Sequence, residues 1–245
     1  MLAIIGGTGL TELANLDVSR RQVVRTPYGE PSGPLTFGAI HGVPVVFLAR
    51  HGYGHTIAPH QVNYRANLWA LKEQGAGEIV SIVSVGGIRA DLDPGTIVVP
   101  HQIIDYTWGR MGTFFENEAP VKHIDFTEPY SAGLRSRLLS AARACGEGAI
   151  DGAVYAATQG PRLETAAEVD RLEREGADIV GMTGMPEAAL AREIDLEYAA
   201  IAVIVNHAAG RGASAGGVPL QQIDQVLKEA VGRVRKIIEG LVAAK

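Results

Sequence analysis

The chain has 245 residues, of which 47% are hydrophobic and 20% are charged, so it is long enough to bury a full core in one domain spanning 1–245. Its formal net charge of −5 disfavours nucleic acid or an anionic membrane as a partner, because either would require a basic face. The single cysteine, Cys145, cannot form an intramolecular disulfide, and no run of about 18 apolar residues occurs. We therefore expect a soluble cytoplasmic protein that binds a small ligand.

Short apolar runs without alternation, rich in Val, Ile and Ala, predict buried strands. In chain order these are residues 2–5, 45–48, 79–83, 153–156, 179–180 and 201–205, with a smaller candidate at 96–99. Helical periodicity predicts helices at residues 64–74, 132–144, 166–175, 187–196 and 220–243. This order of elements predicts an α/β fold in which a mixed, mostly parallel β-sheet is flanked by helices.

Small, polar or cationic residues follow nearly every predicted strand. The segments are Gly6-Gly7-Thr8-Gly9, Arg50-His51-Gly52, Ser84-Val85-Gly86-Gly87, Thr158-Gln159-Gly160-Pro161-Arg162, Met182-Thr183-Gly184 and Asn206-His207-Ala208. In open α/β sheets the ligand crevice lies beyond the carboxyl ends of the strands, so we expect these segments to converge on one pocket. The Gly- and Ala-rich segment 208–219 is a candidate for a mobile lid.

The residue types in these segments suit a free phosphate dianion. Arg50 and His51 leave one strand together and offer a planar cationic fork and an imidazole donor. Hydroxyl groups follow three other strands, at Thr8, Ser84 and Thr183. Each feature alone also has an ordinary interpretation, as a glycine turn or as a surface arginine beside a half-buried histidine. Together they predict an anion site that needs neither lysine nor metal.

Zinc and serine-hydrolase chemistry are competing interpretations. His51, His55 and His60 lie close in sequence, but no cysteine or carboxylate stands beside them at ligand spacing. Ser214 lies in a Gly-x-Ser-x-Gly pattern, but the preceding strand is predicted to end well before it. In that hydrolase fold the histidine follows the serine, whereas His207 is the last histidine of this chain. Both alternatives are therefore disfavoured.

A glycosidase is the third competing interpretation. It would require two carboxylates that face each other across the sugar, and the segments after the strands supply none. They supply the amide of Asn206 beside the expected anion site. An amide beside an anion site favours displacement of the base by phosphate over activation of water.

Taken together, these motifs resemble the trimeric purine nucleoside phosphorylase and methylthioadenosine phosphorylase family. The resemblance runs from residue 4 to the last helix. Its specific pieces are Arg50-His51-Gly52 followed by His55, Ser84-Val85-Gly86-Gly87-Ile88-Arg89, Gln159-Gly160-Pro161-Arg162-Leu163-Glu164 and Gly181-Met182-Thr183-Gly184-Met185-Pro186-Glu187. It implies the nucleoside phosphorylase fold, phosphorolysis of a purine nucleoside, no cofactor beyond phosphate as co-substrate, and a homotrimer.

The resemblance also implies roles for individual residues. It assigns the phosphate site to Thr8, Arg50, His51, Ser84 and Thr183. Substrate contacts are expected from Val85, Gly86, Leu163, Met182, Asn206, Ala208, Ile223, Val226 and Leu227. Met182 would lie against the ribose, and Leu163 stands where the family places an aromatic that stacks on the base. His123 corresponds to a residue that the family borrows from a neighbouring subunit to close the 5′ end of the pocket.

Two positions bear on the substrate. In adenine-specific members, the residues after the last strand resemble Asp-x-Asp. This chain has Asn206-His207-Ala208 there, and the Asn206 amide can donate to a 6-oxygen and accept from a protonated ring nitrogen. Members that take inosine or guanosine place a histidine near the start of the last helix to bind the 5′-hydroxyl, and Ile223 stands there. An apolar residue would leave that hydroxyl unpaired at a cost of ~1–3 kcal/mol.

We therefore expect phosphorolysis of 5′-methylthioinosine to hypoxanthine and 5-methylthioribose 1-phosphate, with Asn206 as the catalytic residue that stabilises the leaving purine. One alternative keeps the reaction and changes the substrate to 5′-methylthioadenosine or to inosine or guanosine. Another is a nucleoside-binding protein without turnover.

Overall fold

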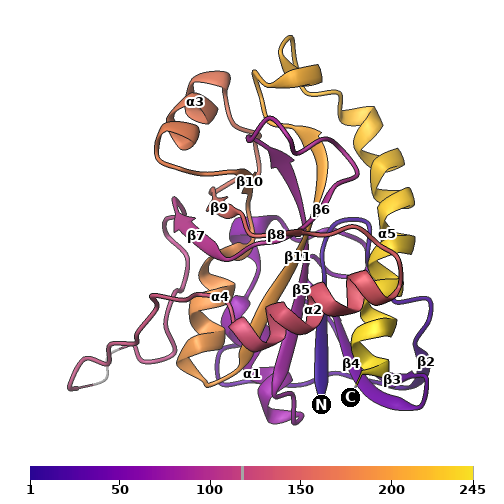
Figure 1. Cartoon of the computed structure of the whole chain (residues 1–245). Coiled ribbons are helices and arrows are strands. Elements are labelled where there is room, and N and C mark those ends of the chain that lie inside the picture. The colour runs from indigo at the N-terminus through magenta and orange to yellow at the C-terminus, as the bar shows by residue number, and fades with distance from the viewer. Residues whose placement is uncertain (117–118, 245) are drawn as a thin grey trace.

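The computed structural model describes residues 1–116 and 119–244, and these ranges contain one sheet of eleven strands. The strands are β1 (Leu2–Gly6), β2 (Asp17–Gln22), β3 (Leu35–Ile40), β4 (Val43–Ala49), β5 (Glu78–Gly87), β6 (Ile97–Val99), β7 (Gln102–Asp105), β8 (Ile150–Asp151), β9 (Val154–Ala157), β10 (Ile179–Gly181) and β11 (Glu197–His207). The main path runs β2-β3-β4-β1-β5-β10-β9-β7, and a branch through β11, β6 and β8 leaves from β5 (Figure 1).

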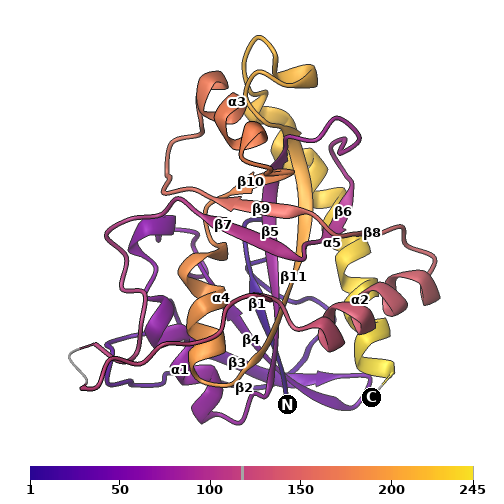
Figure 2. The ribbon, with the colours of Figure 1, turned by 60° about the vertical axis from the view of Figure 1, so that its left-hand side comes forward.

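The centre of the sheet is parallel, because β4, β1, β5 and β11 run side by side in the same direction. β2 and β3 add an antiparallel edge beyond β4. β10 pairs antiparallel with the end of β5 and continues through β9 and β7, and Figure 2 shows this group crossing the upper part of β5 and β11. The predicted mixed, mostly parallel sheet is confirmed.

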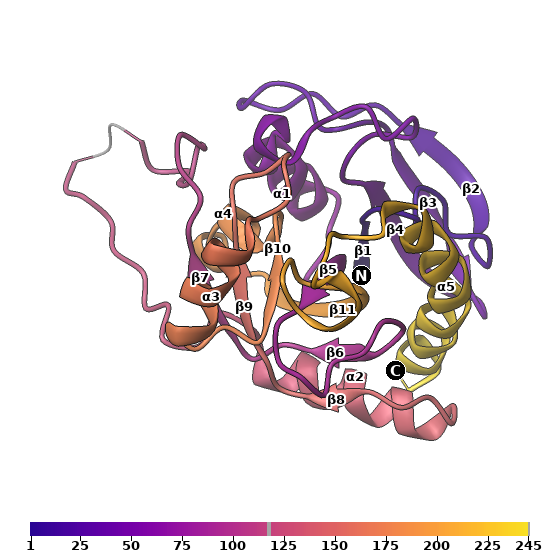
Figure 3. The ribbon, with the colours of Figure 1, turned by 90° about the horizontal axis from the view of Figure 1, so that it is seen from above.

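Helices cover both faces of the sheet. They are α1 (Tyr64–Glu73), α2 (Ala132–Ala144), α3 (Ala166–Arg174), α4 (Gly184–Glu193) and α5 (Leu220–Ala243), with short 3-10 turns η1 (Pro59–Gln61) and η2 (Gly212–Ser214). Because side chains alternate along a strand, Ile5 of β1 packs into the core with α1 and α4, whereas Ile4 packs into the core with α2 and α5. Figure 3 shows the helices arranged around the central strands. Among the described helices, none has the length and apolar character needed to span a membrane.

The helix starts follow from local side-chain chemistry. Asn63, Ser131 and Thr165 each accept a hydrogen bond from a backbone N–H in the first turn of α1, α2 and α3. Thr165 and Glu168 form a reciprocal capping box. The predicted ranges of α2 and α5 are confirmed at both ends, whereas α4 spans Gly184–Glu193 instead of residues 187–196 and has non-helical backbone at Met185.

Two strands extend further than their apolar runs predicted. β5 continues to Gly87, and β11 continues to His207. Ser84 and Asn206 therefore lie inside strands, which corrects their predicted position beyond the strand ends. The reason is mutual pairing: Ser84 is in register with Val203, and Asn206 with Gly86, so each strand supplies a ladder partner past the predicted end of the other.

One edge of β5 has a gap in its pairing between the part that pairs with β1 and the part that pairs with β10. The ladder from β5 to β1 ends at Ser81, and the ladder from β5 to β10 begins at Gly86. Within the described ranges, residues 82–85 of β5 have no strand neighbour on that edge. The gap opens at the carboxyl end of β1, the end at which open α/β sheets bind ligands.

Candidate functional site

A cavity of about 770 Å³ lies where β1 and β10 separate along β5. Its walls come from the segments that follow β1, β4, β9 and β10, from the gap in β5 and from the end of β11. The predicted site residues that line it are Thr8, Arg50, His51, Ser84, Val85, Gly86, Leu163, Met182, Thr183, Asn206, Ala208 and Ile223. Segments that are distant in sequence therefore meet at one cavity of a size suited to a small molecule.

The Arg50 side chain is completely buried and held from three directions. Its Nε and Nη2 bind the two carboxylate oxygens of Glu187 at 2.7 and 2.9 Å, Nη2 also donates to Ser81 at 2.6 Å, and Nη1 donates to the Ile82 carbonyl at 3.0 Å. The Ile82 carbonyl belongs to the gap in β5, so Arg50 replaces the missing strand there. The fork that the sequence suggested for phosphate faces Glu187 instead, which corrects that expectation and leaves one N–H of Nη1 for a ligand.

Glu187 was not assigned a role from the sequence, although it ends one of the family-like motifs. Its carboxylate is fully buried and also accepts hydrogen bonds from Ser81 at 2.7 Å and Tyr198 at 2.8 Å. Burial alone would raise the pKa of Glu187, but the charge of Arg50 and these hydrogen bonds outweigh burial and lower it. Glu187 therefore remains ionised and fixes the orientation of Arg50.

His51 lies beside Arg50 in the cavity wall. Its Nδ1 is 2.8 Å from the Ile57 carbonyl oxygen, and a carbonyl can only accept, so Nδ1 carries the proton. Burial, followed by the charge of Arg50, lowers the pKa of His51 to about 4. In the neutral ring that this pKa favours, Nε2 is left as an acceptor. No group of three or more His, Cys, Asp or Glu side chains within the described ranges could hold a metal ion.

The turn after β1 brings backbone close to the cavity. A Cβ at Gly6 would lie 2.1 Å from the Leu10 carbonyl oxygen, and a Cβ at Gly7 would lie 2.5 Å from the Ile82 carbonyl oxygen and 3.0 Å from Nη1 of Arg50. Both positions therefore require glycine. The tight turn carries Thr8 to the cavity beside Arg50.

A β-bulge presents Asn206. The register between β11 and β5 shifts between Ile204 and Asn206, so Val205 is an extra residue on β11. As a result, the successive residues Val205 and Asn206 both line the cavity, although neighbours on a regular strand point to opposite faces. Asn206 Nδ2 donates to the His207 carbonyl at 2.6 Å, which leaves its second N–H and its Oδ1 for a ligand.

Three predicted substrate contacts lie outside the cavity lining. Leu227 is buried under the first turn, where its Cβ would lie 3.2 Å from a Cβ added at Gly9. Val226 is partly buried on α5, one turn after Ile223, which does line the cavity. His123 is exposed on the irregular segment between β7 and α2. Within this single chain, none of the three reaches the cavity.

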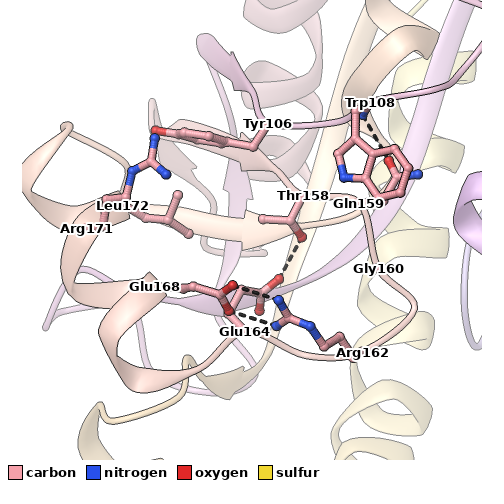
Figure 4. Close-up of a pocket in the computed structure, with 10 residues that line it drawn as sticks. All are labelled: Tyr106, Trp108, Thr158, Gln159, Gly160, Arg162, Glu164, Glu168, Arg171 and Leu172. Carbon is pink, nitrogen blue, oxygen red and sulfur yellow. Dashed lines mark hydrogen bonds and ion pairs between the residues drawn. The ribbon is translucent and has the colours of Figure 1, made fainter.

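A second cavity, of about 340 Å³, is lined by the segment that follows β9, by residues of α3 and by Tyr106 and Trp108 (Figure 4). Arg162 lines both cavities, and both its terminal nitrogens bind the Glu168 carboxylate, at 2.7 and 2.8 Å. The Thr158 hydroxyl donates to Glu164 at 2.6 Å. These contacts fix the loop that carries Leu163 into the larger cavity.

Comparisons with known proteins agree with the fold. A protein of Pseudomonas syringae pv. tomato named probable S-methyl-5′-thioinosine phosphorylase is 52% identical over 243 residues, which cover 99% of this chain and 98% of that protein. The 6-oxopurine nucleoside phosphorylase of Pyrococcus furiosus is 44% identical, over 85% of this chain and 80% of its own length.

A similar solved structure is the methylthioadenosine phosphorylase of Schistosoma mansoni in complex with adenine. It superimposes with a TM-score of 0.94 at 33% identity, over 99% of this chain and 91% of that chain. The family model described as the phosphorylase superfamily matches residues 1–243. The resemblance found in the sequence motifs is thereby confirmed, and the chain belongs to the phosphorylase superfamily.

Proposed function

We propose that the protein is a purine nucleoside phosphorylase that cleaves S-methyl-5′-thioinosine with inorganic phosphate, giving hypoxanthine and 5-methylthioribose 1-phosphate. The observation that carries the proposal is the single cavity shared by Thr8, Arg50, His51, Thr183 and Asn206. Phosphate would bind among the first four together with Ser84, and Asn206 would receive the purine. Relatives named as S-methyl-5′-thioinosine phosphorylases, more than 50% identical to this chain, support the same substrate.

The reaction is a displacement at the anomeric carbon. A phosphate oxygen forms a bond to C1′ as the bond from C1′ to the purine nitrogen breaks, and the electron pair of that bond moves into the purine ring. Positive charge builds on the ribosyl group and is stabilised by the adjacent phosphate. Neutral His51 accepts a hydrogen bond from a protonated phosphate oxygen. A ring nitrogen of the purine takes up a proton from solvent as the base leaves, and Asn206 Oδ1 accepts a hydrogen bond from that N–H.

The preference for a 6-oxopurine rests on Asn206. Its free N–H can donate to the 6-oxygen of hypoxanthine, whereas a 6-amino group would place two donors together. The preference for a 5′-methylthio group rests on the start of α5, where Val218, Leu220 and Ile223 line the cavity. An apolar wall of this kind binds a thiomethyl group and leaves a hydroxyl unpaired.

The decisive experiment compares S-methyl-5′-thioinosine, 5′-methylthioadenosine and inosine as substrates, with and without phosphate. We expect phosphate-dependent release of hypoxanthine, fastest from S-methyl-5′-thioinosine. Asn206→Asp should shift kcat/KM towards the 6-amino nucleoside, because a carboxylate accepts from the amino group. Fastest release of adenine by the unaltered protein would refute the assigned base. Cleavage without phosphate would indicate a hydrolase, and binding without turnover a nucleoside-binding protein.

We further propose that the protein acts in the cytoplasm as a homotrimer in which His123 closes the 5′ end of a neighbouring cavity. The exposed position of His123, away from its own cavity, is compatible with this role. A native mass of three chains, together with a raised KM for the nucleoside in His123→Ala, would support the assembly. A monomer with full activity would contradict it.

A further inference from the structure

Arg110 lies on the irregular segment after β7. Its guanidinium donates hydrogen bonds to four backbone carbonyls. Its Nη1 donates to the Met182 carbonyl at 2.8 Å and also to the Met185 carbonyl, and its Nη2 donates to the carbonyls of Thr158 at 3.2 Å and Gln159 at 2.9 Å. The sequence motifs gave no hint of it, because its partners are main-chain atoms about 50 and 70 residues later in the chain.

The side chain of Gln159 completes the arrangement. Its Oε1 accepts from Nε of Arg110 at 3.2 Å and from the backbone N–H of Trp108 at 3.1 Å, and Figure 4 shows the Gln159 side chain next to Trp108. Within the described ranges, no carboxylate lies within ion-pair distance of Arg110. Carbonyl dipoles, instead of a counter-ion, therefore hold the guanidinium.

These bonds join two of the loops that line the larger cavity. One loop follows β9 and carries Leu163, and the other follows β10 and carries Met182 and Thr183. The loops also touch directly, because a Cβ at Gly160 would lie 2.4 Å from Sδ of Met182. The two loops thus form one unit with Arg110 behind it, outside the cavity lining.

The peptide between Met182 and Thr183 is held at both ends. Its carbonyl accepts from Arg110, and its N–H donates to the hydroxyl of the fully buried Tyr155 at 3.2 Å. A peptide unit is planar, so two fixed ends determine its orientation. That orientation sets the direction in which Thr183 enters the cavity.

We propose that Arg110 is a positioning residue for phosphorolysis: it fixes the Met182–Thr183 peptide and the loop of Gln159, so that Thr183 and Met182 face phosphate and ribose before either binds. This inference rests on the proposed function. Arg110 touches no substrate, and it acts through the geometry of the loops. Misplacement of reacting groups by about 1 Å can cost about a hundredfold in rate, so its loss should be visible in catalysis.

The test is a series of variants assayed by steady-state kinetics, with inorganic phosphate and S-methyl-5′-thioinosine varied in turn. Arg110→Ala should lower kcat/KM by about a hundredfold and raise the KM for phosphate. Arg110→Lys should recover only a minor part, because an ammonium carries the charge but cannot span four carbonyls with a planar fork. Guanidinium ion added to Arg110→Ala should restore part of kcat.

Arg135 provides a matched control. It also donates to two backbone carbonyls, those of Pro100 at 2.8 Å and Val99 at 3.3 Å, but none of its partners lines the larger cavity. Arg135→Ala removes these two bonds and an ion pair with Asp151, and it should leave kcat and both KM values unchanged. Thermal unfolding of the Arg110 and Arg135 variants, measured in parallel, separates loss of fold from loss of positioning.

Tyr155→Phe tests the other end of the same peptide. If both residues act through that peptide, the losses in kcat/KM of Arg110→Ala and Tyr155→Phe should be less than additive in the double variant. Additive losses, full activity in Arg110→Lys, or an Arg110→Ala variant with lowered stability but unchanged kinetics would each overturn the proposal. If the unaltered protein cleaves none of the nucleosides, the proposed function fails, and affinity for inorganic phosphate, measured by calorimetry in the same variants, still tests Arg110.

Discussion

Arg50 and Glu187 show how one residue pair can serve both the fold and the site. The pair is fully buried, and Ser81 and Tyr198 supply the remaining partners of the carboxylate. A buried ion pair adds little net stability compared with apolar groups, but an unpaired buried charge is costly. The pair therefore fixes the orientation of the Arg50 side chain, which lines the cavity.

Glu187→Gln should lower the free energy of unfolding by about 3 kcal/mol or more, because it leaves the Arg50 charge buried without its counter-ion. The measurement is urea denaturation at pH 7. Asp170→Asn, which removes an exposed partner of Arg211, serves as the control and should change the stability by less than about 1 kcal/mol. Equal effects of the two substitutions would show that the buried pair has no special weight.

At the scale of elements, the sequence predicted the helices better than the strands. α2 and α5 were placed correctly at both ends because apolar periodicity sets their length, and a serine cap also marks the start of α2. β2 was missed because it is mostly exposed and carries the sequence DVSRRQ, without a buried run. The ends of β5 and β11 were missed because their polar residues face a cavity that exists only in the folded sheet.

The site was predictable where it depends on strand order and not where it depends on distant contacts. Parallel strands end at one edge of a sheet. This rule was enough to group Thr8, Arg50 and Asn206 as candidates for one site. Glu187 and Arg110 were not assigned because their roles come from partners far away in the chain. The bulge at Val205 leaves no local signal in an apolar run, so the side-chain direction of Asn206 could not be read from the sequence.

The first turn of α5 should control the choice between a 5′-methylthio group and a 5′-hydroxyl. Ile223→His introduces a donor at a position that lines the cavity, and it should raise kcat/KM for inosine relative to S-methyl-5′-thioinosine. A pairing worth ~1–3 kcal/mol corresponds to roughly a 5- to 150-fold change in that ratio. Competition between the two nucleosides in one reaction gives the ratio directly. An unchanged ratio would mean that α5 does not face the 5′ carbon.

At the scale of the whole molecule, two buried groups make the protein sensitive to acid. His51 has a pKa of about 4 in the fold and about 6.5 when unfolded, so below pH 6.5 the unfolded chain binds more protons. Above pH 6.5 His51 is neutral in both states and does not reduce the free energy of unfolding. As the pH falls from 6.5 towards 4, protonation of His51 in the unfolded chain lowers that free energy. Glu187, whose pKa is lowered in the fold, adds a further loss below its ordinary range.

The free energy of unfolding should therefore decrease steadily from pH 7 to pH 4, with the first part of the decrease due to His51. Denaturant titrations at a series of pH values measure it. In His51→Gln, which keeps a donor for the Ile57 carbonyl but cannot titrate, the curve between pH 6.5 and 4 should be flatter. Parallel curves for the two proteins would assign the acid sensitivity elsewhere.

The contact between Arg50 and Glu187 also bears on the order in which parts of the chain can fold during synthesis. During synthesis, β4 leaves the ribosome long before α4, so the Arg50 guanidinium cannot meet the Glu187 carboxylate until more than a hundred further residues have been made. An unpaired buried charge is costly, so burial of the Arg50 guanidinium should follow the arrival of α4. The orientation of Arg50 in the cavity wall therefore depends on two parts of the polypeptide that are made far apart in time.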